Sequence, residues 1–184
     1  MKKTNLNCFL PSFQDNSGHE NSYLKVYEKF SKVKNFNVEL FVAKNNKIKT
    51  TLKKKNIFFK NNDFILIKFI NIFRNLIAIS KINKLNKKET IFLLDGYSIY
   101  FLFSFALSLN NFRKFEKLIL FCRYNQKGFQ RIIFKFLLYI LNIKFLNCIL
   151  ITDNDLNYQI FKKDYKKNNI RYFPTPFFTK KKNY

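Results

Sequence analysis

The chain has 184 residues and a formal net charge of +24, and 47% of its residues are hydrophobic. This length suits one domain with its own core, which buries about 70% of the surface of the unfolded chain, and the hydrophobic content excludes a disordered protein. With 3 Gly and 1 His, the sequence has no glycine-rich phosphate loop, no Ser-His-Asp triad in the usual order and no His-rich metal centre, and we expect no metal.

The first third of the chain is predicted to alternate between strands and a helix. Asn5–Leu10 is a short apolar strand, and a polar loop leads to Ser17–Glu20, whose end residues fit a helix capping box. The helix that follows has apolar residues at helical spacing, and Phe36–Ala43 alternates as a second strand. The basic segment 44–60 is predicted to be irregular, apart from a short strand at Ile57–Phe59.

The rest of the chain continues this alternation. Its cleanest helical stripe runs from Phe129 to Leu141 and includes Ile132 and Phe136. A second capping box, Thr152–Asp155, is predicted to start a short helix that ends near Lys163. The other predicted elements are a helix over Asp63–Leu85, a strand over Thr90–Leu94, an apolar helix over Tyr97–Leu109, and strands over Leu118–Cys122, Cys148–Thr152 and Ile170–Phe173.

Apolar strands separated by helices are typical of a parallel sheet that is covered on both faces. We therefore predict one doubly wound α/β domain of the Rossmann-like type over residues 1–178, with 179–184 as a basic tail. Thr90–Leu109 and Ile132–Ile151 approach the length of a membrane span, but charged residues interrupt both, and strand-plus-helix pairs explain them better. The three Cys lie in apolar runs without a C-x-x-C pair, which indicates reduced, buried thiols in the cytoplasm.

Polar residues follow the predicted strands and mark a candidate site. Doubly wound sheets bind ligands outside the carboxyl ends of their strands, and Asp95, Arg123 and Asp153 stand at such ends. Helix capping accounts for Asp153 equally well. These residues are predicted to share one cleft.

The first loop is the second part of this candidate site. Ser17 and Gly18 precede a helix whose free amides and dipole suit an anion, and Gly18 would let a phosphate approach the backbone. A purely structural cap explains the same residues. His19 is a candidate base or partner of a sugar hydroxyl, although a His at a helix start is more often merely solvated.

The order of these pieces resembles the N-terminal half of a GT-B glycosyltransferase, most closely glycosyltransferase family 4. The segments that carry the resemblance are Gly18–Glu20 with its helix, Phe36–Val42, Ile149–Leu156 and Ile170–Pro176. The resemblance implies a nucleotide-sugar donor, and a glycan or a lipid-linked saccharide as acceptor. It also implies a cytoplasmic protein with peripheral attachment to the inner face of the membrane.

The resemblance also implies roles for the candidate residues. Ser17 and Gly18 would lie near the donor phosphates, and His19 and Asp95 are the candidates for catalysis, although His19 has no secure counterpart. The acceptor side of the cleft would be lined by Glu20, Asp95, Arg123 and Asp153.

The chain departs from that family because the donor-binding second domain is not part of the sequence. We therefore expect a truncated enzyme, or one that needs a partner chain or a further domain. The alternative is a non-catalytic basic α/β module that binds an anionic membrane surface or nucleic acid. Nucleic acid is the less favoured partner, because the lysine runs Lys53–Lys55 and Lys180–Lys182 are not interleaved with aromatic residues. Scattered lysines also fit a merely solvated surface.

Overall fold

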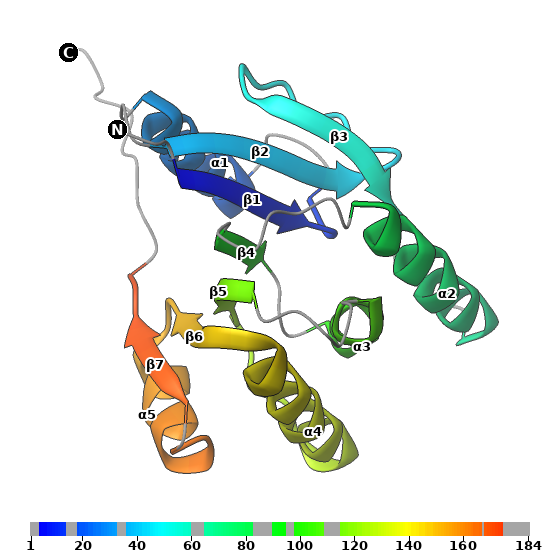
Figure 1. Ribbon diagram of the computed structural model, residues 1–184. Coiled ribbons are helices and arrows are strands. Elements are labelled where there is room, and N and C mark those ends of the chain that lie inside the picture. Colours follow the sequence, from blue (N-terminus) through cyan, green and yellow to red (C-terminus); the bar gives the residue numbers. More distant parts are fainter. Residues whose placement is uncertain are drawn as a thin grey trace.

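A computed structural model describes residues 4–13, 18–32, 36–59, 65–82, 90–94, 98–108, 115–166 and 168–174. Within these residues, seven strands form one sheet in the order β3-β2-β1-β4-β5-β6-β7, and all neighbouring strands are parallel (Figure 1). The predicted α/β domain of the Rossmann-like type is confirmed. The strands are β1 (Thr4–Leu10), β2 (Phe36–Ala43), β3 (Lys53–Phe58), β4 (Thr90–Leu94), β5 (Phe115–Phe121), β6 (Phe145–Thr152) and β7 (Asn169–Tyr172). The helices are α1 (Gly18–Lys32), α2 (Ile65–Ile82), α3 (Ile99–Ser108), α4 (Gly128–Lys144) and α5 (Asp155–Asp164).

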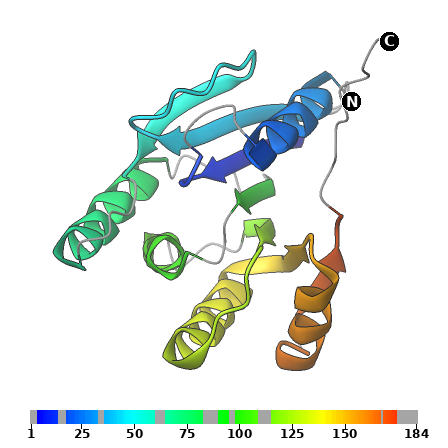
Figure 2. The same ribbon diagram turned by 180° about the vertical axis from the view of Figure 1, so that it is seen from behind.

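The helices lie on both faces of the sheet, as Figures 1 and 2 show from opposite sides. The chain adds β2 and β3 on one side of β1 and then returns to add β4 on the other side. Because crossovers between parallel strands are right-handed, this reversal places α1 on one face and the later helices on the other. The core accordingly has two parts: one packs α1 against β1 and β2, and one packs α2, α3, α4 and α5 against the opposite face.

Strand β3 corrects the prediction of an irregular basic segment. It begins at Lys53, upstream of the predicted strand, and pairs with β2 along the edge of the sheet. The Nζ atoms of Lys53 and Lys55 lie 3.4 and 2.9 Å from Oε1 of Glu39 on β2, so one carboxylate offsets two ammonium groups. Lys54 Nζ donates to the Ile48 carbonyl at 2.8 Å. Lysines on an edge strand also discourage pairing with another chain.

The predicted stripe of α4 is only partly the buried one. Leu137 and Leu141 are buried, but Phe129, Ile132 and Phe136 of the same stripe are exposed by 74, 64 and 58%. The buried side of the helix is instead made by Phe134, Leu137, Leu138 and Leu141. Helix α4 is apolar on both sides, so its periodicity alone does not indicate which side packs against the sheet.

Buried polar groups fix the helices of this layer to one another. Ser104 on α3 donates to the Ile72 carbonyl of α2 at 2.9 Å. Lys144 on α4 donates from Nζ to the Ala106 carbonyl of α3 at 2.7 Å. That carbonyl lies in the last turn of α3, where the helix dipole favours a cation. Burial lowers the pKa of Lys144 from its ordinary value.

The apolar segment near residue 100 forms the buried helix α3. Its buried residues include Phe101, Leu102 and Phe105, which contact the sheet. Among the described residues, no helix is both long and apolar enough to cross a membrane. A strand followed by a buried helix therefore accounts for this stretch, as predicted.

We expect the thiols of the native protein to be unreactive. Cys8, Cys122 and Cys148 are all free and buried, and burial raises the pKa of Cys8 and raises that of Cys148 to about 12. At pH 8, Ellman's reagent should modify all of these thiols in guanidinium chloride and none under native conditions, because the thiolate is the nucleophile. Cys8 and Cys148 ionise near pH 9 in the unfolded chain and only at higher pH in the folded one, so their raised pKa values lower the stability as the pH rises above about 9. Rapid native modification would contradict the buried positions.

Candidate functional site

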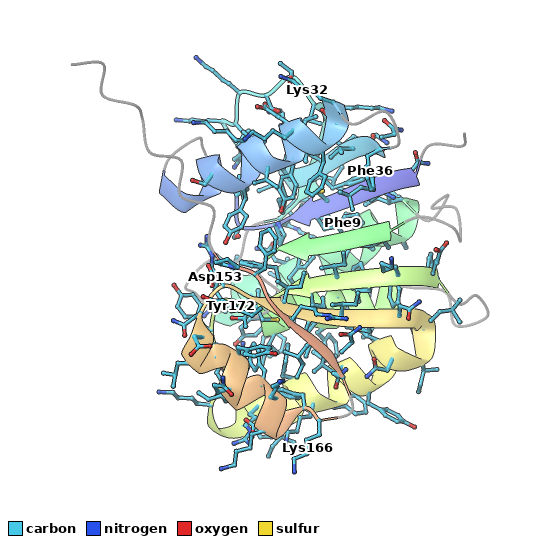
Figure 3. All side chains as sticks on the ribbon, turned by 90° about the vertical axis from the view of Figure 1, so that its left-hand side faces the viewer. Phe9, Lys32, Phe36, Asp153, Lys166 and Tyr172 are labelled. Carbon is cyan, nitrogen blue, oxygen red and sulfur yellow. The ribbon has the colours of Figure 1, made fainter. Side chains whose placement is uncertain are left out.

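Two of the predicted site residues meet at the carboxyl edge of the sheet. Arg123 follows β5 and Asp153 follows β6, and Arg123 Nε lies 3.9 Å from Asp153 Oδ2. Their side chains are 21 and 14% exposed. Figure 3 places Asp153 beside Tyr172, the last residue of β7, at this same edge. The structure thus brings Arg123 and Asp153 together at one edge of the sheet.

A third residue, Tyr23 of α1, completes the cluster. Its hydroxyl donates to Asp153 Oδ2 at 3.1 Å, and its ring centroid lies 5.2 Å from Cζ of Arg123. The ring also packs edge-on against Phe121, at 5.1 Å between centroids. The helical spacing of the apolar residues predicts for Tyr23 only a place on the apolar face of its helix. The signal for its role was the hydroxyl, because a Tyr on a buried face usually needs a hydrogen-bond partner.

The start of α5 explains why Asp153 is available to this cluster. The predicted capping box Thr152–Asp155 is wrong: the N-cap is Asn154, whose side chain accepts from the Asn157 amide at 3.1 Å. Thr152 is still part of β6, because its carbonyl accepts from the Phe173 amide at 2.8 Å. The helix therefore begins after Asp153, and the Asp153 carboxylate contacts Arg123 and Tyr23.

The backbone at the end of β5 is fixed as well. The Cys122 amide donates to the Ile151 carbonyl at 2.8 Å, which continues the pairing of β5 with β6. The Asn157 side chain on α5 donates to the Arg123 carbonyl. These bonds fix the main chain at Arg123, while Asp153 and the Tyr23 ring lie beside its guanidinium. A planar guanidinium in a fixed position suits a carboxylate or phosphate, which it binds with two parallel hydrogen bonds.

The other predicted site residues are less well placed by the structure. Ser17 and Asp95 lie outside the described residues, as does the tail 179–184. Gly18, His19 and Glu20 form the first turn of α1, but their side chains are outside the described part. Where the structure is described, no group of three or more His, Cys, Asp or Glu residues could hold a metal ion.

A cavity of about 590 Å³ lies elsewhere, beside α2, and was not predicted. Its cations are Lys44, Lys55, Arg74 and Lys81. Lys44 Nζ lies 4.1 Å from the ring centroid of Phe59, and Cζ of Arg74 lies 5.2 Å from the same ring. Aromatic contacts therefore position two of these cations. The sequence alone did not indicate this cavity, because its residues come from separate segments.

Comparison with models of known protein families gave no match, and no curated protein matched the sequence. The resemblance to glycosyltransferases therefore depends on the residues quoted above.

Proposed function

We propose that the chain is the acceptor-side half of a GT-B glycosyltransferase. It would transfer a sugar from a nucleotide-sugar donor to a glycan or lipid-linked acceptor, together with a donor-binding half. The observation that supports this most is the cluster of Arg123, Asp153 and Tyr23 at the carboxyl edge of the sheet.

The topology supports a ligand crevice at this edge. The strand order reverses between β1 and β4, since β1 leads to β2 on one side and β4 lies on the other. In doubly wound sheets, the crevice outside such a switch point is where ligands bind. Helix α1 begins at Gly18. Its second turn carries Tyr23, which contacts Asp153 of the cluster.

The charges favour an anionic group in the crevice. The N-terminus of α1 has a partial positive charge, and Arg123 adds a guanidinium whose charge is offset in part by Asp153 at 3.9 Å. A phosphate of the donor, or of a lipid-linked acceptor, matches both. Asp153 and Tyr23 act as positioning residues for the guanidinium. His19 and Asp95 stay the candidates for the base that takes the proton of the acceptor hydroxyl.

Binding of soluble probes tests the proposal. Equilibrium dialysis would use a panel of uridine and guanosine diphosphate sugars, and farnesyl phosphate linked to one sugar as a water-soluble analogue of a lipid-linked acceptor. We expect at least one probe to bind saturably, and Arg123→Gln to weaken it about tenfold or more, since charged hydrogen bonds contribute about 1.5–3 kcal/mol each. Tyr23→Phe should weaken binding less, because it keeps the ring and loses only the hydroxyl.

Arg74→Gln is the matched control for the nucleotide-sugar probes, which have no apolar chain, and Lys162→Gln, which removes an exposed charge on α5, is the control for the farnesyl probe. Arg74 lies on α2 at the cavity and is exposed, so the variant removes the same charge at a distant place. A loss with Arg74→Gln and not with Arg123→Gln would overturn the crevice assignment. Absence of binding for every probe would overturn the proposal and favour the non-catalytic basic module.

A further inference from the structure

Helices α2 and α4 each present a row of large apolar side chains to solvent. We call these residues the α2–α4 apolar surface. Each of its side chains is between 41 and 74% exposed. On α2 they are Leu66, Phe69, Ile70, Phe73 and Ile77, and on α4 they are Phe129, Ile132, Phe136, Tyr139 and Ile143.

The opposite sides of the same helices are already packed. Helix α3 lies between α2 and α4 on one face of the sheet, and Figures 1 and 2 agree on this order. On α2 the side toward the core carries Ile72, Asn75 and Ile79, all buried. The exposed rows therefore make no contribution to the domain core. Rows of large apolar side chains in solvent mark an interaction surface more often than scattered single residues do.

The charges on this surface are mostly positive, and the acid that lies beside it, Asp164 on α5, is paired with Arg131. Helices α2, α3 and α4 contain no Asp or Glu. Their exposed or half-buried cations are Lys68, Arg74, Lys81, Arg131 and Lys135. Lys68 Nζ lies 5.6 Å from the centroid of the Tyr100 ring. Long basic side chains beside an apolar row can cover apolar surface and still extend their charge outward.

The basic cavity adjoins the α2 part of the surface. Ile77 belongs to the apolar row and also lines the cavity, together with Lys44, Lys55, Arg74 and Lys81. The residues that line the cavity include no acid, although Lys55 pairs with Glu39 outside the cavity lining at 2.9 Å. A phosphate placed there would lie directly beside an apolar row. This combination matches a lipid whose headgroup is anionic and whose chains are apolar.

We propose that the α2–α4 apolar surface attaches the protein to an anionic phospholipid bilayer. The apolar rows enter the boundary between headgroups and acyl chains, and the surrounding cations contact lipid phosphates. A second copy of the chain fits this surface less well, because two such faces would bring together more cations than Asp164 beside α4 offsets. This proposal does not depend on the glycosyltransferase function.

Vesicle co-sedimentation tests the attachment. The purified chain is mixed with phosphatidylcholine vesicles that contain about 30% phosphatidylglycerol, or none, at about 0.1 M salt. We expect binding to the anionic vesicles only, with a marked loss at about 0.5 M salt. Phe73→Ser combined with Phe136→Ser should weaken partitioning about tenfold or more. Arg74→Gln should weaken it about fivefold, because one basic residue near an anionic surface contributes about a factor of five.

The controls use matched residues on α5, outside the surface. Leu156→Ser removes an apolar side chain that is 69% exposed, and Lys162→Gln removes an exposed charge. Neither should change partitioning, and circular dichroism should show that all variants fold. Equal binding of the Phe73/Phe136 variant and the parent would overturn the proposal, as would equal binding to neutral vesicles. If the parent forms concentration-dependent dimers in sedimentation velocity and this variant does not, the surface serves self-association. If the variant loses binding to a protein ligand, the surface serves that partner. Either result would also overturn the membrane proposal.

Discussion

Phe9→Ala is expected to lower the free energy of unfolding by about 3–5 kcal/mol, the range for removing a buried aromatic ring. Phe9 is the penultimate residue of β1 and is fully buried. Its ring centroid is 5.0 Å from that of Phe41 on β2, 5.4 Å from Phe58 on β3 and 5.6 Å from Phe105 on α3. The substitution would leave a cavity where three strands and one helix meet. Small domains are stable by only about 5–15 kcal/mol, so this is a large fraction of the total.

Urea unfolding followed by circular dichroism measures this effect. Phe173→Ala is the matched control, because Phe173 is 44% exposed and should cost about 1 kcal/mol or less. Phe9→Leu should fall between the two, since it retains part of the buried volume. A loss below about 1 kcal/mol for Phe9→Ala would show that Phe9 is not at the centre of the core.

Asn75→Ala should lower the free energy of unfolding by about 2–4 kcal/mol. The Asn75 side chain binds both backbone groups of Phe59: its Oδ1 accepts from the Phe59 amide at 2.7 Å, and its Nδ2 donates to the Phe59 carbonyl at 2.9 Å. Asn75 is buried at the middle of α2, and Phe59 directly follows β3. Alanine would leave two backbone groups without partners, and each such group costs about 1–3 kcal/mol where it is buried.

The control for this prediction is Asn142→Ala on the exposed side of α4. It should change the stability by about 0.5 kcal/mol or less. Asn75→Asp should cost at least as much as Asn75→Ala at neutral pH, because it buries a carboxylate and places one of its oxygens against the Phe59 carbonyl in place of a donor. Equal melting temperatures for Asn75→Ala and Asn142→Ala would contradict a bridge between α2 and β3.

Much of the fold was predictable from local patterns. Phe36–Ala43 and Thr90–Leu94 have the bounds that their apolar residues predicted, the first from alternation and the second from an apolar run. Strand β3 was largely missed. Lys53–Lys55 give no apolar signal, and they join the sheet through pairing with β2 and contacts with Glu39. Such contacts depend on residues that are distant in the sequence.

The candidate site was predictable in part. A position directly after a strand indicated Arg123 and Asp153, because the carboxyl ends of parallel strands meet at one edge. Tyr23 was not assigned to the site, since it reaches this edge from α1. It is 130 residues away from Asp153 in the chain. The capping of α5 by Asn154, which leaves Asp153 to the cluster, depends on how far β6 extends.

The sequence by itself determined the fold class, since alternating apolar strands and helices allow few arrangements other than a parallel, doubly wound sheet. It also determined that α4 is a helix, because the period of its apolar residues is helical. Only the tertiary structure decided which side of that helix is buried. Phe134 and Leu138 pack against the sheet, whereas Phe129 and Phe136 face solvent. The physical reason is that both sides are apolar, so the choice depends on the neighbours that α3 and the sheet supply.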